Sequence, residues 1–135
     1  MAEVKVALRN VAGTEAALGW AGVHTIVVDR PEGKAGGSGL GFNGAELLGL
    51  ALGGCFANDL RYVAHELGIA LDTVEIGVTV TLDGTPLVAT DAAMTIACTC
   101  ADGGDPAAVI AAAEARCTVS HSLQRGVRVT IARAG

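Results

Sequence analysis

The stretch from Asn43 to Gly68, NGAELLGLALGGCFANDLRYVAHELG, predicts one long helix. Asn43 followed three residues later by Glu46 matches a capping box, in which the Asn side chain accepts from the first free amides and the Glu side chain reaches back. Gly68 suits the end of a helix because glycine readily takes a left-handed conformation. We therefore expect a helix over about Gly44–Leu67.

Small residues recur along this helix at every fourth position, namely Ala45, Gly49, Gly53 and Ala57. A glycine inside a helix costs about 1 kcal/mol relative to Ala, so the stripe indicates a face that is packed closely. Two interpretations are open. The stripe packs against the chain's own sheet or second helix, or it crosses a copy of itself in a dimer.

The flanking segments predict strands. Alternating apolar residues over 4–8 and an apolar run over 23–29 predict two strands before the helix. After it, residues 74–82 alternate strictly, Asp83 and Gly84 predict a turn, and a second strand follows up to Cys100. These two segments are expected to form an antiparallel hairpin.

Two further elements are expected after the hairpin. Asp105 and Pro106 predict the N-cap and first-turn proline of a helix that ends near Arg116, and residues 127–131 predict a last strand. The glycine-rich segment 30–43 is expected to be a long functional loop. The order of elements predicts a single α+β domain over residues 1–135.

Composition excludes several classes of protein. A net charge of -5, without a basic stripe, argues against binding to nucleic acid or an acidic lipid surface. The longest stretches without a charged residue, 16–28 and 47–58, are shorter than the roughly 18 residues of a membrane span. Charges near the N-terminus disfavour a signal peptide, so we expect a cytoplasmic protein. The 51% hydrophobic residues then indicate surface that is buried against another subunit.

Two of the four cysteines lie close together in the predicted second strand of the hairpin. Cys98 and Cys100 share an apolar face with Met94, which favours a role in the core. The alternative is a metal site that adds Cys117 and His121. Zinc accepts these ligand types, but the spacings lack the usual C-x2-C and H-x3-5-H pattern.

The other two cysteines have different surroundings. Cys55 follows two glycines in GGCFAND, which leave its sulfur open to whatever approaches that face. Cys117 comes just after the second helix, where the helix dipole disfavours a thiolate. This position suits a resolving thiol better than a first nucleophile. The residues alone leave open whether all four cysteines only fill the core.

The segments around Cys55 and Cys117 resemble the OsmC/Ohr family of organic hydroperoxide reductases and osmotically induced proteins. The resemblance rests on GAELLGLALGGC, which ends at Cys55, and on A-x-x-x-C-x-V-S-x-S-L-x-R-G-V around Cys117, and it covers about residues 23–132. It implies an intertwined α+β homodimer, in which antiparallel sheets wrap around a long central helix and the active sites lie at the subunit boundary.

The resemblance also implies a cysteine-based peroxidase. The Cys55 thiolate would attack an organic hydroperoxide and become a sulfenic acid, and Cys117 would condense with it to a disulfide. An external dithiol would restore both thiols, and no metal or bound cofactor would be needed. The alternative is a small-molecule-binding or stress-associated protein of the same fold without fast peroxidase turnover.

The sequence departs from the family pattern at the cation that should activate Cys55. The hydroperoxide reductases use an Arg from the N-terminal hairpin, held by a Glu ten residues before the first Cys, where this chain has Ala45. Glu46 lies about 13 Å along the helix from Cys55 and on its other side, so it is interpreted first as a cap and second as a catalytic carboxylate. Arg30, delivered by the long loop, is the predicted catalytic cation.

Three more residues are predicted to contact the substrate. Asp59 is one helical turn beyond Cys55 and would oppose ionisation of the thiol, unless it holds an Arg in place. Phe56 is next to Cys55, and His121 is close enough to Cys117 to tune it.

Overall fold

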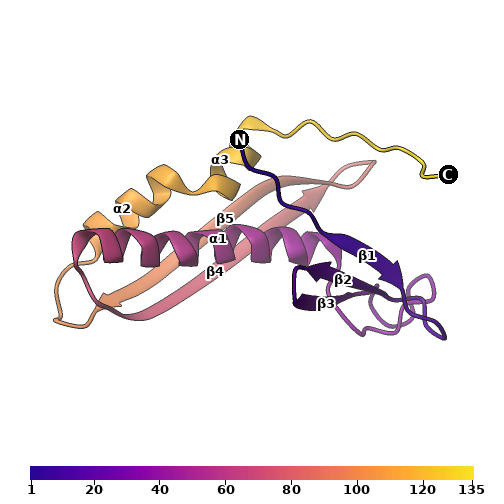
Figure 1. The fold of residues 1–135 in the computed structure, drawn as a ribbon, viewed down its shortest axis with the longest axis horizontal. Coiled ribbons are helices and arrows are strands. Elements are labelled where there is room, and N and C mark those ends of the chain that lie inside the picture. Colours follow the sequence, from indigo (N-terminus) through magenta and orange to yellow (C-terminus); the bar gives the residue numbers. More distant parts are fainter. The chain divides into compact units, whose positions relative to one another are not determined.

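The computed structural model describes residues 1–135 and confirms the α+β class (Figure 1). In chain order the elements are β1 Ala7–Asn10, β2 Ala17–Ala21, β3 His24–Val28, α1 Gly44–Leu67, β4 Leu71–Asp83, β5 Val88–Cys100, α2 Ala107–Arg116 and α3 Thr118–Arg125. The chain divides into two compact units, Met1–Leu48 and Gly49–Gly135, which are described separately. None of the helices is long and apolar enough to cross a membrane.

The first unit contains a three-stranded antiparallel sheet in the order β1-β2-β3. The strand predicted over 4–8 lies further along the chain, because β1 spans Ala7–Asn10 and leaves Val4 and Val6 exposed outside the sheet. β3 lies within the predicted range 23–29. β2 was not predicted from the sequence.

Asp29 organises the loop that follows β3. One carboxylate oxygen accepts from the backbone amides of Ser38 and Leu40 at 3.0 and 3.1 Å, and the other accepts from the amide of Arg30 at 2.8 Å. Asp29 is 3% exposed, and these bonds, above all that from Leu40, hold the pKa of its carboxyl below the ordinary value. The glycine-rich segment is therefore tied to the end of the sheet by one buried carboxylate.

The long helix α1 has the predicted bounds, Gly44–Leu67. The amide of Glu46 donates to the Asn43 side chain and the amide of Asn43 donates to the Glu46 carboxylate, both at 2.9 Å, which is the predicted capping box. At the other end Gly68 takes a φ of 69°, which terminates the helix without strain.

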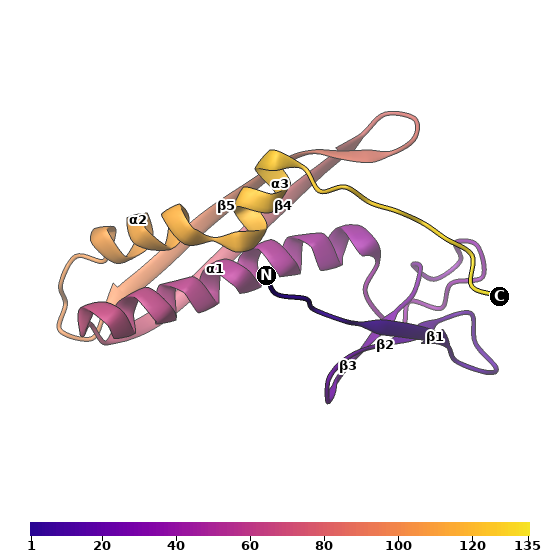
Figure 2. The same cartoon turned by 45° about the horizontal axis from the view of Figure 1, so that its top comes forward.

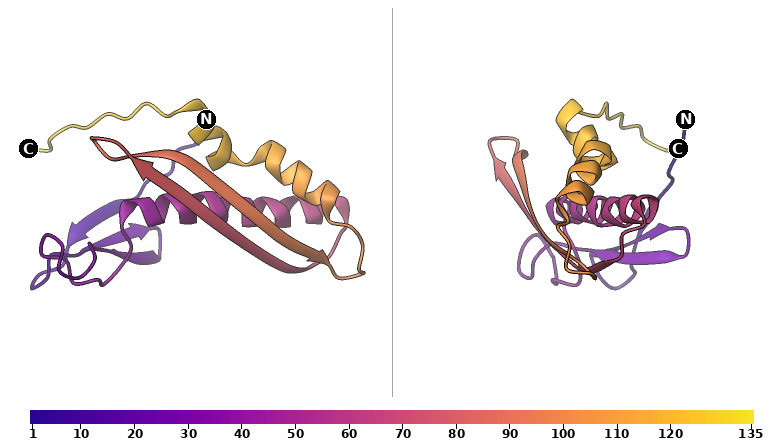
Figure 3. Two further views of the ribbon diagram at one scale, coloured as in Figure 1. Left: turned by 180° about the vertical axis from the view of Figure 1, so that it is seen from behind. Right: turned by 90° about the vertical axis from the view of Figure 1, so that its left-hand side faces the viewer.

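The second unit is built on the β4–β5 hairpin. Its register pairs Ile76 with Ile96 and Val78 with Met94, and the alternate residues on both strands are exposed. The part of α1 in this unit and α2 both cover the apolar face of the hairpin (Figure 3). The buried core between them consists of Phe56, Leu60, Val63, Ala64, Val109, Ala113 and Cys117.

The small-residue stripe of α1 faces the hairpin of its own chain. A Cβ atom added at Gly53 would lie 3.0 Å from a methyl group of Val78, and one at Gly49 would lie 3.4 Å from a methyl group of Val80. The glycines thus let the helix backbone approach β4, which confirms the first of the two interpretations. Gly54 has open space around its Cα instead.

Two expectations for the C-terminal third need correction, and one helix there was not expected. Residues 127–135 form no strand, and Val127, Val129 and Ile131 are all exposed, because β4 and β5 pair only with each other. An unpredicted helix, α3, precedes this segment. At α2, Pro106 occupies the N-cap position in place of Asp105, and the Asp105 carboxylate accepts a hydrogen bond from the backbone amide of Ala107.

Candidate functional site

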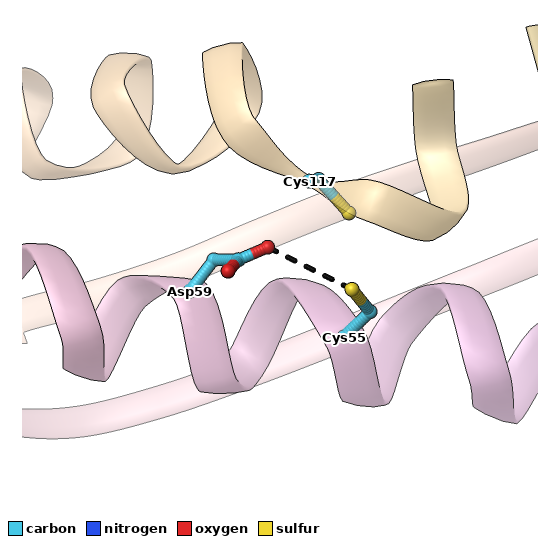
Figure 4. A group of neighbouring side chains, drawn as sticks. All are labelled: Cys55, Asp59 and Cys117. Atoms are coloured by element: carbon cyan, nitrogen blue, oxygen red, sulfur yellow. Dashed lines mark hydrogen bonds between the residues drawn. The ribbon is translucent and has the colours of Figure 1, made fainter. Parts of the chain in front are cut away.

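Cys55, Asp59 and Cys117 converge in the second unit (Figure 4). Cys55 and Asp59 lie one turn apart on the same face of α1, and Cys117 reaches them from the junction between α2 and α3. One donor atom from each of the three side chains lies within 4.8 Å of the other two. The Cys55 thiol donates to the Asp59 carboxylate with a sulfur-to-oxygen distance of 3.7 Å.

Cys117 is the residue at which α2 ends and α3 begins. Its backbone is extended, with φ -62° and ψ 108°, and α3 turns away from the direction of α2 at this point (Figure 2). The sequence placed Cys117 only at a helix C-terminus, whereas it also occupies the N-cap position of α3. That second position faces free amides, which favour a thiolate.

Burial outweighs this favourable effect at Cys117. The side chain is 0% exposed, and its removal from water raises the pKa of the thiol above the ordinary value. The backbone amide of Ser120 acts in the opposite direction, while neighbouring Cys55 and Asp59 raise the pKa further. Burial thus favours the neutral form of the Cys117 thiol, and the half-buried Cys55 is the more accessible of the two.

Arg116 supplies a cation that the sequence reasoning missed. Its Nε lies 4.0 Å from Asp59 Oδ1, its Nη1 donates to the Glu66 carboxylate at 2.8 Å, and its guanidinium lies 5.8 Å from the centre of the Tyr62 ring. The hydrogen bond and charge of Glu66, more than Asp59, raise the pKa of Arg116. Asp59, Tyr62 and Glu66 follow one another at spacings of three and four, a signal that marks one face of α1.

The two other predicted catalytic residues lie in the first unit. Glu46 forms the capping box described above, in agreement with its first interpretation. The Arg30 guanidinium forms an ion pair with Asp29 at 3.3 Å and donates to the backbone carbonyl of Glu15. That either side chain acts on Cys55 in the other unit stays a prediction.

The remaining predicted contacts lie at different depths. Phe56 is buried in the core between α1 and α2, whereas His121 is exposed on α3 and its Nε2 lies 2.9 Å from the carbonyl of Ala115. Roles for Phe56, Asp59 and His121 in substrate binding stay predictions.

Cys98 and Cys100 lie on the inner face of β5, as expected for core residues. Burial raises the pKa of the Cys98 thiol, and the neighbouring Cys100 raises it further by a smaller amount. Cys117 groups with Cys55 and Asp59 and not with these two cysteines, so the alternative metal set of Cys98, Cys100, Cys117 and His121 is not assembled.

The second unit therefore defines a class of small α+β protein, in which one thiol on a long helix meets a second thiol from a helix junction above an antiparallel hairpin. The family model described as OsmC-like protein matches residues 36–132. The chain belongs to this family. No curated protein sequence matches it.

Solved structures share the fold at low sequence identity. An OsmC-like protein from Mycoplasma pneumoniae is 15% identical with a TM-score of 0.74, over 91% of this chain and 88% of the other. An organic hydroperoxide resistance protein from Legionella pneumophila is 20% identical with a TM-score of 0.64, over 92% and 90%. The organic hydroperoxide resistance protein OhrB of Bacillus subtilis is 22% identical with a TM-score of 0.55, over 89% and 90%.

Proposed function

We propose that this protein is a cysteine-based peroxidase that reduces organic hydroperoxides. The observation that carries the proposal is the approach of an accessible thiol on α1, Cys55, to a buried thiol at a helix junction, Cys117, with their sulfurs within 4.8 Å. A disulfide needs about 2.05 Å between sulfurs, so closure requires a local movement of a few ångströms. Hydroperoxide resistance among proteins of the same fold supports this choice of oxidant.

The proposed reaction oxidises two thiols by two electrons and reduces one peroxide by two. The Cys55 thiolate attacks the terminal oxygen of the hydroperoxide, the O–O bond breaks, and the alkoxide takes a proton and leaves as an alcohol. The Cys117 thiol then displaces hydroxide from the Cys55 sulfenic acid, which leaves as water when it takes the Cys117 proton. An external dithiol reduces the resulting disulfide and becomes a disulfide itself.

Arg116 supports the first step of this proposal. An isolated Asp59 carboxylate beside Cys55 would oppose ionisation of the thiol, and Arg116 at 4.0 Å from Asp59 offsets its charge. We therefore propose Arg116 as a positioning and compensating cation in addition to Arg30. An external dithiol that reduces the disulfide would suit a reducing compartment such as the cytoplasm.

Reaction of the reduced protein with tert-butyl hydroperoxide tests this function. We expect stoichiometric loss of two thiols, formation of alcohol, and a mass that is lower by two hydrogen atoms. Peptide mapping should place the new bond between Cys55 and Cys117. In Cys117→Ser, a sulfenic acid should persist on Cys55 and be captured by dimedone.

Matched variants identify the thiol that reacts. Cys55→Ser should consume no peroxide, and Cys98→Ser should react like the wild type because Cys98 lies on β5, outside the thiol pair. Equal reactivity of wild type and Cys55→Ser would contradict the proposal, as would a disulfide that involves Cys98 or Cys100.

A second function has one observation in its favour, namely the Asp59 carboxylate that accepts the Cys55 thiol hydrogen. In a binding or stress-associated protein without fast turnover, this contact would hold the Cys55 thiol in place and leave it unreactive. Wild-type protein whose thiols survive a peroxide concentration that oxidises a control thiol peroxidase would favour this alternative.

A further inference from the structure

We propose that Cys55, Asp59 and Cys117 bind one thiophilic divalent cation, with Zn²⁺ as the typical member, and leave one coordination position open. The proposal does not rest on the peroxidase function, because it requires only the donor atoms and their spacing. Two sulfur donors and one carboxylate oxygen are ligand types that Zn²⁺ accepts, and three protein ligands with one open position are a common arrangement.

The distances between donors fit a tetrahedral ion. With zinc bonds of about 2.3 Å to sulfur and about 2.1 Å to oxygen, the sulfur–oxygen edge of a tetrahedron is about 3.6 Å and the sulfur–sulfur edge about 3.8 Å. Cys55 Sγ and Asp59 Oδ2 are 3.7 Å apart, and all three donors lie within 4.8 Å of one another. Each distance from Cys117 Sγ therefore needs to shorten by no more than roughly 1.2 Å to bring Cys117 to the same ion.

Helical backbone positions two of these donors. Cys55 and Asp59 are held at positions i and i+4 of α1, so both point to the same side, and Cys117 approaches from the opposite wall (Figure 4). Cys117 is fully buried and the Asp59 side chain is 12% exposed, which removes competing water from two of the ligands. Half-buried Cys55 is the most exposed of the three ligands, so it is the donor that an ion from the solvent would reach first.

The charge of the surroundings also fits. Two thiolates and one carboxylate carry three negative charges, and a divalent ion leaves one. Arg116 lies 4.0 Å from Asp59 Oδ1, the oxygen that does not accept from Cys55, so it can offset the remaining charge while Oδ2 binds the metal. Such contacts to the second oxygen of a ligand carboxylate orient it and are typical of metal sites.

Occupancy by the metal and formation of the disulfide exclude each other, because both use the lone pairs of the same two sulfurs. A bound ion would shield the thiols from peroxide and alkylating agents. The ion would therefore act as a protective or inhibitory ligand of this pair.

Titration of the fully reduced protein with Zn²⁺, and with Co²⁺ as a spectroscopic probe, tests the site without any peroxide. We expect one equivalent per chain and the sulfur-to-cobalt absorption bands of a thiolate complex. Cys55→Ser, Cys117→Ser and Asp59→Asn should each weaken binding by about tenfold or more. Cys98→Ser and His121→Asn should bind like the wild type.

Circular dichroism of each variant shows whether it is folded, and a second measurement leaves the sequence intact. One equivalent of Zn²⁺ should slow alkylation of Cys55 by iodoacetamide at least tenfold and leave alkylation of Cys98 unchanged. The proposal is overturned if the wild type binds no stoichiometric metal, if binding survives replacement of both Cys55 and Cys117 by serine, or if Zn²⁺ slows both cysteines equally.

Discussion

Arg116 is the residue that most changes the interpretation of the thiol pair. Arg116 comes fifty positions after Glu66, its hydrogen-bond partner on α1. Its guanidinium also lies near the Asp59 carboxylate, which accepts a hydrogen bond from the Cys55 thiol. The expected requirement for a cation near the nucleophile thus has a second candidate besides Arg30. This cation is the last residue of α2, directly before Cys117.

Replacement of Arg116 by glutamine should slow the reaction of Cys55 with iodoacetamide about tenfold, because the Asp59 charge then acts on the thiol without compensation. The double variant Arg116→Gln/Asp59→Asn should recover most of the rate, since the neutral amide no longer opposes a thiolate. Rates from quenched alkylation and peptide mass analysis give both values. Arg61→Gln, which changes the net charge equally at an exposed site of α1, serves as the control. Equal rates for Arg116→Gln and Arg61→Gln would remove Arg116 from the site.

Asp29 should make the stability of the protein depend on acid pH. Its folded-state pKa is lowered, so its contribution is present above the unfolded value of about 3.9 and is lost as the pH falls through the folded value. Asp29→Asn should therefore be less stable than the wild type at pH 7, and the gap should narrow below about pH 4. Denaturant unfolding at several pH values measures the difference in the free energy of unfolding between the wild type and the variant. Asp72→Asn, at an exposed site, serves as the control. A gap that stays constant down to pH 2 would contradict the assignment.

Among the elements, α1 and the β4–β5 hairpin were predictable because each carries local signals that agree with its packing. The capping box and Gly68 define the ends of α1, and strict alternation defines β4. The helix α3 was missed because it is only eight residues long, and its two large apolar residues, Val119 and Leu123, are too few to indicate a helix on their own. The last strand was wrong for a different reason, since residues 127–131 have the pattern of a strand but no partner strand in this chain.

The closeness of α1 to β4 gives a matched pair of glycine substitutions. Gly53→Leu should destabilise the protein by about 1–3 kcal/mol, because the new side chain meets the methyl groups of Val78. Gly54→Leu meets open space and should stabilise the helix by up to about 1 kcal/mol. Thermal and denaturant unfolding compare the two variants. Similar losses at both positions would show that Gly54 also faces a packed surface.

For the whole molecule, the residues alone did not pair Cys55 with Cys117. Their proximity depends on the packing of α1 and α2 on one hairpin, and only the resemblance to a family implied it beforehand. The same resemblance implies a homodimer, which we propose for this chain. The alternating apolar residues Val127, Val129 and Ile131, which are 67%, 76% and 94% exposed, support it because such a segment suits strand pairing with a second copy.

Val129→Asp should therefore shift the protein from dimer to monomer, because it places a charge on the apolar side of this segment. Thr130→Asp adds the same charge on the opposite side of the segment, and we expect this variant to remain a dimer. Analytical ultracentrifugation at matched concentrations reports both. A wild-type protein that sediments as a monomer, or equal dissociation by the two variants, would contradict pairing through this segment.

The single non-helical residue between α2 and α3 also has a mechanical consequence. Cys117 lies at the junction between two helices, so we expect a bond that pulls its backbone toward α1 to reorient α3, which has no buried residue to hold it. Oxidation of the two thiols would therefore change the mobility of α3 at the surface of the protein. Amide hydrogens of α3 should exchange faster in the oxidised than in the reduced protein, while those of β4 stay unchanged, and exchange mass spectrometry can follow both in one experiment.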